Sequence, residues 1–125
     1  MYKSTTKDPN KFIGEGRSLQ DLHQWKFQDN IEAQKICLLF TNALSLPIIL
    51  VMFSGHNNEH LYGVYNPKHR AITLHKPGES LATLIHEICH YYSIDHDWKF
   101  KDKLQCLAIH ARAFVDAYSK GEIEL

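Results

Sequence analysis

The spacing of apolar residues predicts a long amphipathic helix in the first third of the chain. Between Asp29 and Ser45, apolar residues recur at intervals of three and four positions, as they do on the buried face of a helix. Asp29 followed by Glu32 is the capping-box pattern that opens such a helix. A shorter helix is expected over 18–27. The predicted buried face of the longer helix consists of Ile31, Ile36, Leu39, Phe40, Ala43 and Leu44.

Three segments in the middle of the chain have the character of strands. Ile48–Phe53 is a wholly apolar run of strand length, which favours a central strand. Leu61–Tyr65 and Ala71–His75 are separated by Asn66-Pro67-Lys68-His69, and an Asn-Pro step favours a turn. The two segments therefore predict an antiparallel pair. Together the three segments predict a small, mainly antiparallel, three-stranded sheet.

The helical pattern returns in the last third of the chain. One helix is expected from about Glu79 to Ser93, and a final helix from near Asp97 to Tyr118, ended by Gly121. The fold class is therefore α+β, with one domain over 18–125 after a polar, flexible leader over 1–17. The residues predicted to face the core are Leu81, Leu84, Ile85, Ile88 and Tyr92 in the first helix and Phe100, Leu104, Leu107, Ala111, Phe114 and Tyr118 in the second.

Composition excludes several classes of protein. The 125 residues carry 14 basic and 14 acidic side chains, so no overall charge attracts the protein to nucleic acid or to an acidic membrane. The three cysteines, Cys37, Cys89 and Cys106, form no Cys-x-x-Cys pair, which argues against a disulfide framework and a cysteine zinc ribbon. No signal-like apolar segment opens the sequence, so we expect a cytoplasmic protein. Nine histidines point to metal or proton chemistry.

The chemistry is concentrated in the sequence His86-Glu87-Ile88-Cys89-His90, an H-E-x-x-H motif. On a helix, His90 lies about 40° around the axis from His86, so both imidazoles can reach one Zn²⁺ from the face opposite the core. Glu87 then lies beside the metal and suits the role of general base. A catalytic zinc site needs a third ligand and an open fourth position. We expect His96 to supply that ligand if the helix ends near Ser93 and the chain turns back.

The same stretch resembles a known family. Thr83–His90, followed after five residues by His96–Phe100, is similar to the signature of SprT-like and WLM-type zinc metallopeptidases. In these families the third-ligand histidine is followed by Gly or Asp, two variable residues and Phe, and His96, Asp97 and Phe100 match that pattern. The resemblance implies a compact gluzincin-like core. The cysteine ribbon found at the C-terminus of SprT proteins has no counterpart here.

Carried onto this sequence, the resemblance implies that His86, His90 and His96 bind zinc, that Glu87 is the catalytic carboxylate, and that Phe100 is a packing residue. It also implies a polypeptide substrate, and DNA-associated proteins as a biological target. We therefore predict a zinc metallopeptidase in which Glu87 activates a zinc-bound water for attack on the peptide bond. No membrane partner is expected.

Parts of the mechanism stay open at this point. Tyr91, Tyr92, His75 and His110 are all candidates to stabilise the oxyanion. The strand Ala71–His75 is a candidate edge for pairing with an extended substrate. Cys89 is expected to be a small buried residue, and the exposed lysines near Trp98 are candidates for contact with DNA. His56 and His60 are four residues apart, but Gly55 and two asparagines predict a loop there and argue against a second metal site.

Three alternative functions also remain. The first is a noncatalytic, zinc-stabilised module that binds DNA or protein, which would have no use for Glu87. The second is a zinc hydrolase whose substrate is not a peptide. The third, a metzincin, is disfavoured because Ser93 replaces the glycine of that motif and both methionines, Met1 and Met52, lie upstream of it.

Overall fold

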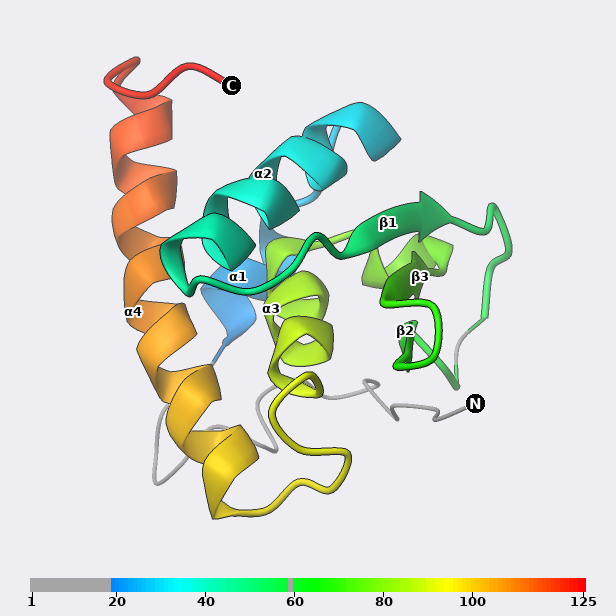
Figure 1. The fold of residues 1–125 in the computed structure, drawn as a ribbon. Helices are drawn as coiled ribbons and strands as arrows, with labels where there is room; N and C mark the ends of the chain where they lie inside the picture. The colour runs from blue at the N-terminus through cyan, green and yellow to red at the C-terminus, as the bar shows by residue number, and fades with distance from the viewer. Residues whose placement is uncertain (1–18, 59) are drawn as a thin grey trace.

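The computed structural model describes residues 19–58 and 60–125, which contain four α-helices and a three-stranded sheet (Figure 1). The predicted α+β fold class is confirmed, whereas the leader predicted over 1–17 lies outside the described residues. No helix in the described ranges is long and apolar enough to cross a membrane. The elements are α1 (Gln20–Gln24), α2 (Asn30–Ala43), β1 (Leu50–Phe53), β2 (Gly63–Asn66), β3 (Ala71–Leu74), the short 3-10 helix η2 (Lys76–Gly78), α3 (Leu81–Cys89) and α4 (Trp98–Ser119).

The sheet is mixed and has the strand order β1-β3-β2. The antiparallel pair is confirmed, because β2 runs antiparallel to β3, and the Asn66 side chain accepts hydrogen bonds from two backbone N–H groups of the turn between them. β1 pairs in parallel with β3 and lies at the edge, so the prediction of a central strand is wrong. Only one face of β1 packs on the core: Val51 is buried, whereas Leu50 and Met52 are exposed.

Helix α2 covers the outer edge of β1 with two side-chain amides. Asn30 donates to the carbonyl of Val51 and accepts from the N–H of Phe53, both at 2.8 Å. Gln34 donates to the carbonyl of Ile49 at 3.0 Å and accepts from the N–H of Val51 at 2.7 Å. Two amides one helical turn apart thus match backbone groups two residues apart on a strand. This edge of the sheet is satisfied without another strand.

The face of α2 that packs on the core differs from the predicted one. The helix begins as expected, with the Asp29 side chain accepting from the N–H of Glu32. Ile31, Leu39 and Ala43 are exposed, however, because the helix is rotated to lay its amides on β1. The buried residues of α2 are Glu32, Ala33, Ile36, Cys37, Phe40 and Thr41.

Helix α3 is the centre of the fold. It lies between α4 and the strands (Figure 1) and also contacts α1 and α2. All nine of its residues are buried. The helix is shorter than the predicted 79–93 because the chain turns after Cys89. It has no solvent-facing side, so the two imidazoles of the motif are inside the protein rather than on an outer face.

Helix α4 begins and ends as the sequence predicts. The Asp97 side chain accepts from the N–H of Phe100 at 3.1 Å, which caps the first turn. Gly121 follows the helix with a positive φ of 73°, a conformation that glycine adopts without strain. The predicted inner face of α4 is buried from Phe100 to Phe114, and Tyr118 is half-buried. α4 thereby packs along α3 and fixes the loop between them.

Candidate metal centre

The three histidines of the motif converge, although they come from different local structures. His86 lies in α3, His90 is its C-terminal capping residue, and His96 lies in the loop just before α4. The Nε2 atoms of His90 and His86 are 3.2 Å apart, and those of His96 and His86 are 3.3 Å apart. The ligand atoms of all three residues lie within 4.8 Å of one another. The chain therefore turns after α3 and brings His96 back, as expected.

These separations fit a tetrahedral metal ion. Bonds of about 2.0 to 2.1 Å from zinc to imidazole nitrogen, at tetrahedral angles, place neighbouring ligand nitrogens about 3.3 Å apart. The Nε2 separations of 3.2 Å between His90 and His86 and 3.3 Å between His96 and His86 agree with that value. The cluster could therefore hold a metal ion. In residues 19–58 and 60–125 it is the one group of histidine, cysteine or acidic side chains with such a geometry.

Burial keeps the three imidazoles neutral at physiological pH, which is the form that binds metals. It lowers the pKa of His86 well below the usual range, and the neighbouring His90 and His96 lower it further. Burial also lowers the pKa of His90 to about 4, even though the hydrogen bond to Ser93 acts in the opposite direction. The pKa of His96 is lowered mainly by its partial burial. No proton has to be removed from these rings at neutral pH before a metal binds.

Two contacts around the cluster hold the rings in place. The Nδ1 atom of His90 lies 2.9 Å from the carbonyl oxygen of Ser93, which can only accept a hydrogen bond, so the proton is on Nδ1 and the lone pair is on Nε2. The fully buried ring of Phe100 packs against all three imidazoles, with ring centres 4.6 to 4.8 Å apart. Phe100 is thus a packing residue, as the resemblance implies.

Glu87 is buried beside the cluster and packs against strand β2. Its side chain is inaccessible to solvent. A Cβ atom placed on Gly63 of β2 would lie 3.2 Å from both the Cγ and the Oε2 of Glu87, and 3.0 Å from the Cγ2 of Thr83. Only glycine leaves this carboxylate its present space. Gly63 is not among the residues predicted for the site, although a glycine inside a strand can signal the close approach of another group.

The structure separates the four candidates for oxyanion stabilisation. Tyr91 and Tyr92 line a cleft together with His90. His75 instead forms a 2.6 Å hydrogen bond with Ser54 at the ends of β3 and β1. His110 lies on α4 and lines a separate groove. Of the four candidates, the two tyrosines are therefore the ones that share a cleft with a histidine of the cluster.

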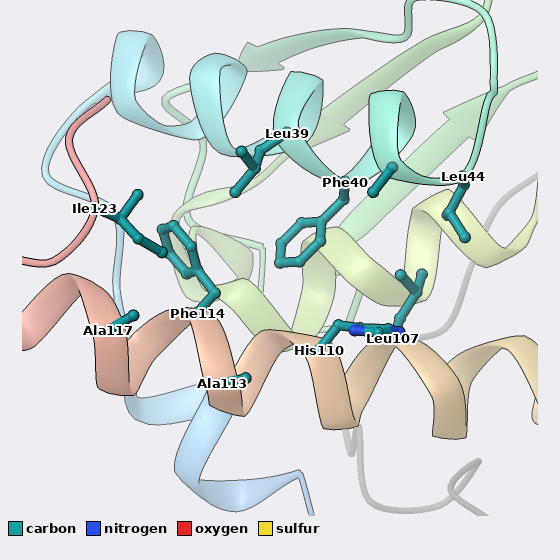
Figure 2. Close-up of a pocket in the computed structure, with 10 residues that line it drawn as sticks. Leu39, Phe40, Leu44, Leu107, His110, Ala113, Phe114, Ala117 and Ile123 are labelled. Atoms are coloured by element: carbon teal, nitrogen blue, oxygen red, sulfur yellow. The ribbon is translucent and has the colours of Figure 1, made fainter.

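The groove with His110 runs between α2 and α4 and has a volume of about 450 Å³ (Figure 2). Its walls are almost entirely apolar, and Phe40 and Phe114 face each other across it from the two helices. None of the three clustered histidines lines this groove. It is therefore a feature separate from the candidate metal centre.

Three further expectations are settled by the fold. Cys89 is fully buried, as predicted, and burial is the main cause of its raised pKa. His56 and His60 lie in the irregular segment between β1 and β2, outside the histidine cluster. β3 offers no edge to a substrate, because β1 and β2 flank it on both sides. The proposal of a substrate edge on Ala71–His75 is therefore wrong.

Comparisons with known proteins assign the chain to no family: no family model matches it, and neither a curated protein nor a solved structure shows significant similarity to it.

Proposed function

We propose that the protein is a zinc metallopeptidase in which His86, His90 and His96 bind Zn²⁺ and Glu87 is the catalytic base. The observation that carries the proposal is the convergence of three imidazoles, with the Nε2 atoms of His90 and His96 each 3.2 to 3.3 Å from Nε2 of His86, while the buried carboxylate of Glu87 directly follows His86 in α3. Three histidine ligands leave a fourth position for water or substrate, as in catalytic rather than structural zinc sites. The similarity to the SprT-like and WLM-type signature supports the same function.

The residues around the site have distinct roles in this reaction. When bound, Zn²⁺ lowers the pKa of a water ligand towards about 7 and polarises a carbonyl. The Glu87 carboxylate accepts a proton from the attacking water and then donates it to the leaving amine nitrogen. In this mechanism a hydroxyl from Tyr91 or Tyr92 donates a hydrogen bond to the developing oxyanion, and the lining of the His90 cleft by both residues supports that role. The Ser93 carbonyl accepts from Nδ1 of His90 and so keeps the ring's lone pair on Nε2, the atom that would bind the metal.

The first experiment separates metal binding from catalysis. Zinc content and cleavage of an unfolded protein such as casein are measured for the wild type and for Glu87→Gln, which keeps the shape of the side chain. We expect Glu87→Gln to retain one zinc per chain and to lose cleavage by at least about 100-fold. Unchanged cleavage by this variant contradicts the role of Glu87. Zinc without any wild-type cleavage favours the noncatalytic module instead.

A second pair of variants tests the ligand set. His96→Ala is expected to lose zinc, whereas the matched control His110→Ala, which alters an exposed histidine on α4, is expected to retain it. Full zinc retention in His96→Ala contradicts the third ligand. Each cleavage assay is run with and without DNA, because a DNA-associated substrate is part of the proposal. The surface proposed for that contact is the exposed Trp98, with Lys99 6.0 Å from its ring.

A further inference from the structure

A cleft of about 460 Å³ lies next to His90, between the β2–β3 turn and the segment that follows α3. This volume is within the range of small-ligand pockets. Tyr65 and Arg70 line it from the sheet side, and Tyr91 and Ile94 line it from the other side. His90 is part of the cleft wall. A substrate peptide bound at the histidine cluster would therefore have a residue next to its scissile bond within reach of this cleft.

The charge of the cleft is set by one residue. Among the described residues, Arg70 is the only lysine, arginine, aspartate or glutamate that lines it. None of the ion pairs formed in residues 19–58 and 60–125 involves Arg70. The pKa of Tyr65 is raised by burial and by Tyr91 and is lowered by Arg70, so the three groups are close enough to interact electrostatically. Within the part of the chain that the structure describes, the cleft wall therefore contains one guanidinium and three phenol groups, and no acidic side chain.

The backbone at Arg70 gives a second reason to look for a role. Its φ is 49°, in the left-handed region that glycine and asparagine occupy more easily than arginine. The residue is held there, because its carbonyl accepts a 3.0 Å hydrogen bond from the N–H of Leu50 in β1. A long cationic side chain thus occupies a position whose backbone favours glycine. Backbone strain of this kind often occurs at positions where the side chain has a function.

We propose that this cleft is a subsite for a carboxylate of the substrate and that Arg70 is the residue that binds it. A guanidinium can pair with a carboxylate through two parallel hydrogen bonds, and the phenol groups of Tyr65 and Tyr91 can donate further ones. The carboxylate belongs to an aspartate or glutamate side chain near the scissile bond or to the C-terminus of the substrate. The assignment rests on the proposed function, since it places the substrate at the histidine cluster.

Binding is measured first, without turnover, on the zinc-loaded Glu87→Gln protein. The probes are fluorescent, acetylated and amidated alanine-rich decapeptides with a central Glu, Gln or Lys, read out by anisotropy at low salt. We expect the Glu peptide to bind about fivefold more tightly than the Gln peptide, because Arg70 is exposed and its pairing is screened. A fourth peptide, with central Gln and a free C-terminal carboxylate, identifies the source: tighter binding than its amidated form assigns the subsite to the chain end.

Arg70→Gln, added to this protein, is expected to bring the binding ratio of the Glu and Gln peptides close to one. Lys68→Gln is the matched control, because it removes one positive charge from the same turn outside the cleft, and it should leave the ratio unchanged. Equal binding of all four peptides before Arg70 is changed overturns the proposal. A carboxylate preference that survives Arg70→Gln also overturns it, because the metal then binds the carboxylate.

Cleavage separates this inference from the proposed function. The termini that the otherwise wild-type enzyme produces from casein are mapped by mass spectrometry. We expect aspartate and glutamate to be enriched at one fixed position beside the cut bond, and Arg70→Glu to replace them with lysine and arginine. Cuts without acidic enrichment, together with a binding preference for the chain end, restrict the subsite to that source. Absence of cleavage contradicts the peptidase function but not the carboxylate subsite. The binding ratio of the Glu and Gln peptides then decides whether that subsite exists.

Discussion

Replacing Gly63 with alanine tests whether the activity depends on where the Glu87 carboxylate lies. Gly63 is in β2 and has no positive φ, so alanine can adopt its backbone conformation. The added methyl group would lie 3.2 Å from the Cγ and the Oε2 of Glu87 and 3.0 Å from the Cγ2 of Thr83. Ordinary carbon contacts are about 3.5 to 4.0 Å. The carboxylate therefore has to move by a few tenths of an ångström.

The expected magnitudes follow from this displacement. Overpacking costs about 1 to 3 kcal/mol, and replacing glycine in a strand returns about 0.5 to 1 kcal/mol, so the net loss of stability is about 1 kcal/mol. A reacting group misplaced by 1 Å costs about 100-fold in rate, so a smaller movement predicts a fall in kcat of about tenfold. The three atoms nearest to the added methyl group belong to Thr83 and Glu87 rather than to the histidine cluster, so zinc content should stay the same.

The assay combines steady-state cleavage, zinc content and urea unfolding for Gly63→Ala, with and without Thr83→Ser. Thr83→Ser removes the Cγ2 atom that makes the closest contact, while the contacts with Glu87 remain. The double variant should therefore recover stability without recovering kcat. Recovery of both would show that Gly63 acts through general packing. An unchanged kcat in Gly63→Ala would refute the reasoning, as would a fall in kcat that is matched by loss of zinc.

Three further substitutions or conditions give separate tests. Phe100→Ala should lower the free energy of unfolding by about 3 to 5 kcal/mol and weaken zinc binding in a chelator competition, because this ring packs on all three imidazoles; unchanged zinc affinity would contradict that support. Gln34→Glu can still accept a hydrogen bond from the N–H of Val51 but cannot donate one to the carbonyl of Ile49. Urea unfolding should therefore show a free energy of unfolding lower by about 1 to 3 kcal/mol, and an unaltered midpoint would contradict the contribution of this edge contact. The metal-free protein should lose stability as pH falls from about 6.5 to about 4, because the pKa of His90 is lowered to about 4 on folding and the unfolded chain then binds more protons; a flat urea midpoint over this range would contradict it.

Local signals predicted the ends of the long helices but not how the strands are arranged. Asp29, Asp97 and Gly121 act through bonds or conformations within a few residues, and the structure has all three as expected. The apolar run before Phe53 could not reveal an edge strand, because the exposure of Leu50 and Met52 depends on where α2 and β3 lie. Tertiary packing, rather than residue type, decided that point.

The candidate site shows the same division. His86 and His90 are one helical turn apart, so their proximity follows from the helix alone. The roles of Gly63 and Arg70 depend on β2 and the β2–β3 turn packing beside α3, between segments that are about 20 or more residues apart in sequence. A glycine within a strand signals at most that some group comes close to Gly63, and the sequence does not say which one. The contacts of Gly63 and Arg70 therefore had to come from the structure.

The position of the cluster inside the fold links metal binding to stability. α3 supplies core residues such as Ile85 and Ile88 and also His86 and Glu87, all fully buried. Burying imidazoles and a carboxylate is costly unless they have partners, and a bound cation offsets part of that cost. A ligand that binds only the folded state also stabilises it by mass action. Because Phe100 of α4 packs on all three rings, metal binding would stabilise the contact between α3 and α4 on which the core depends.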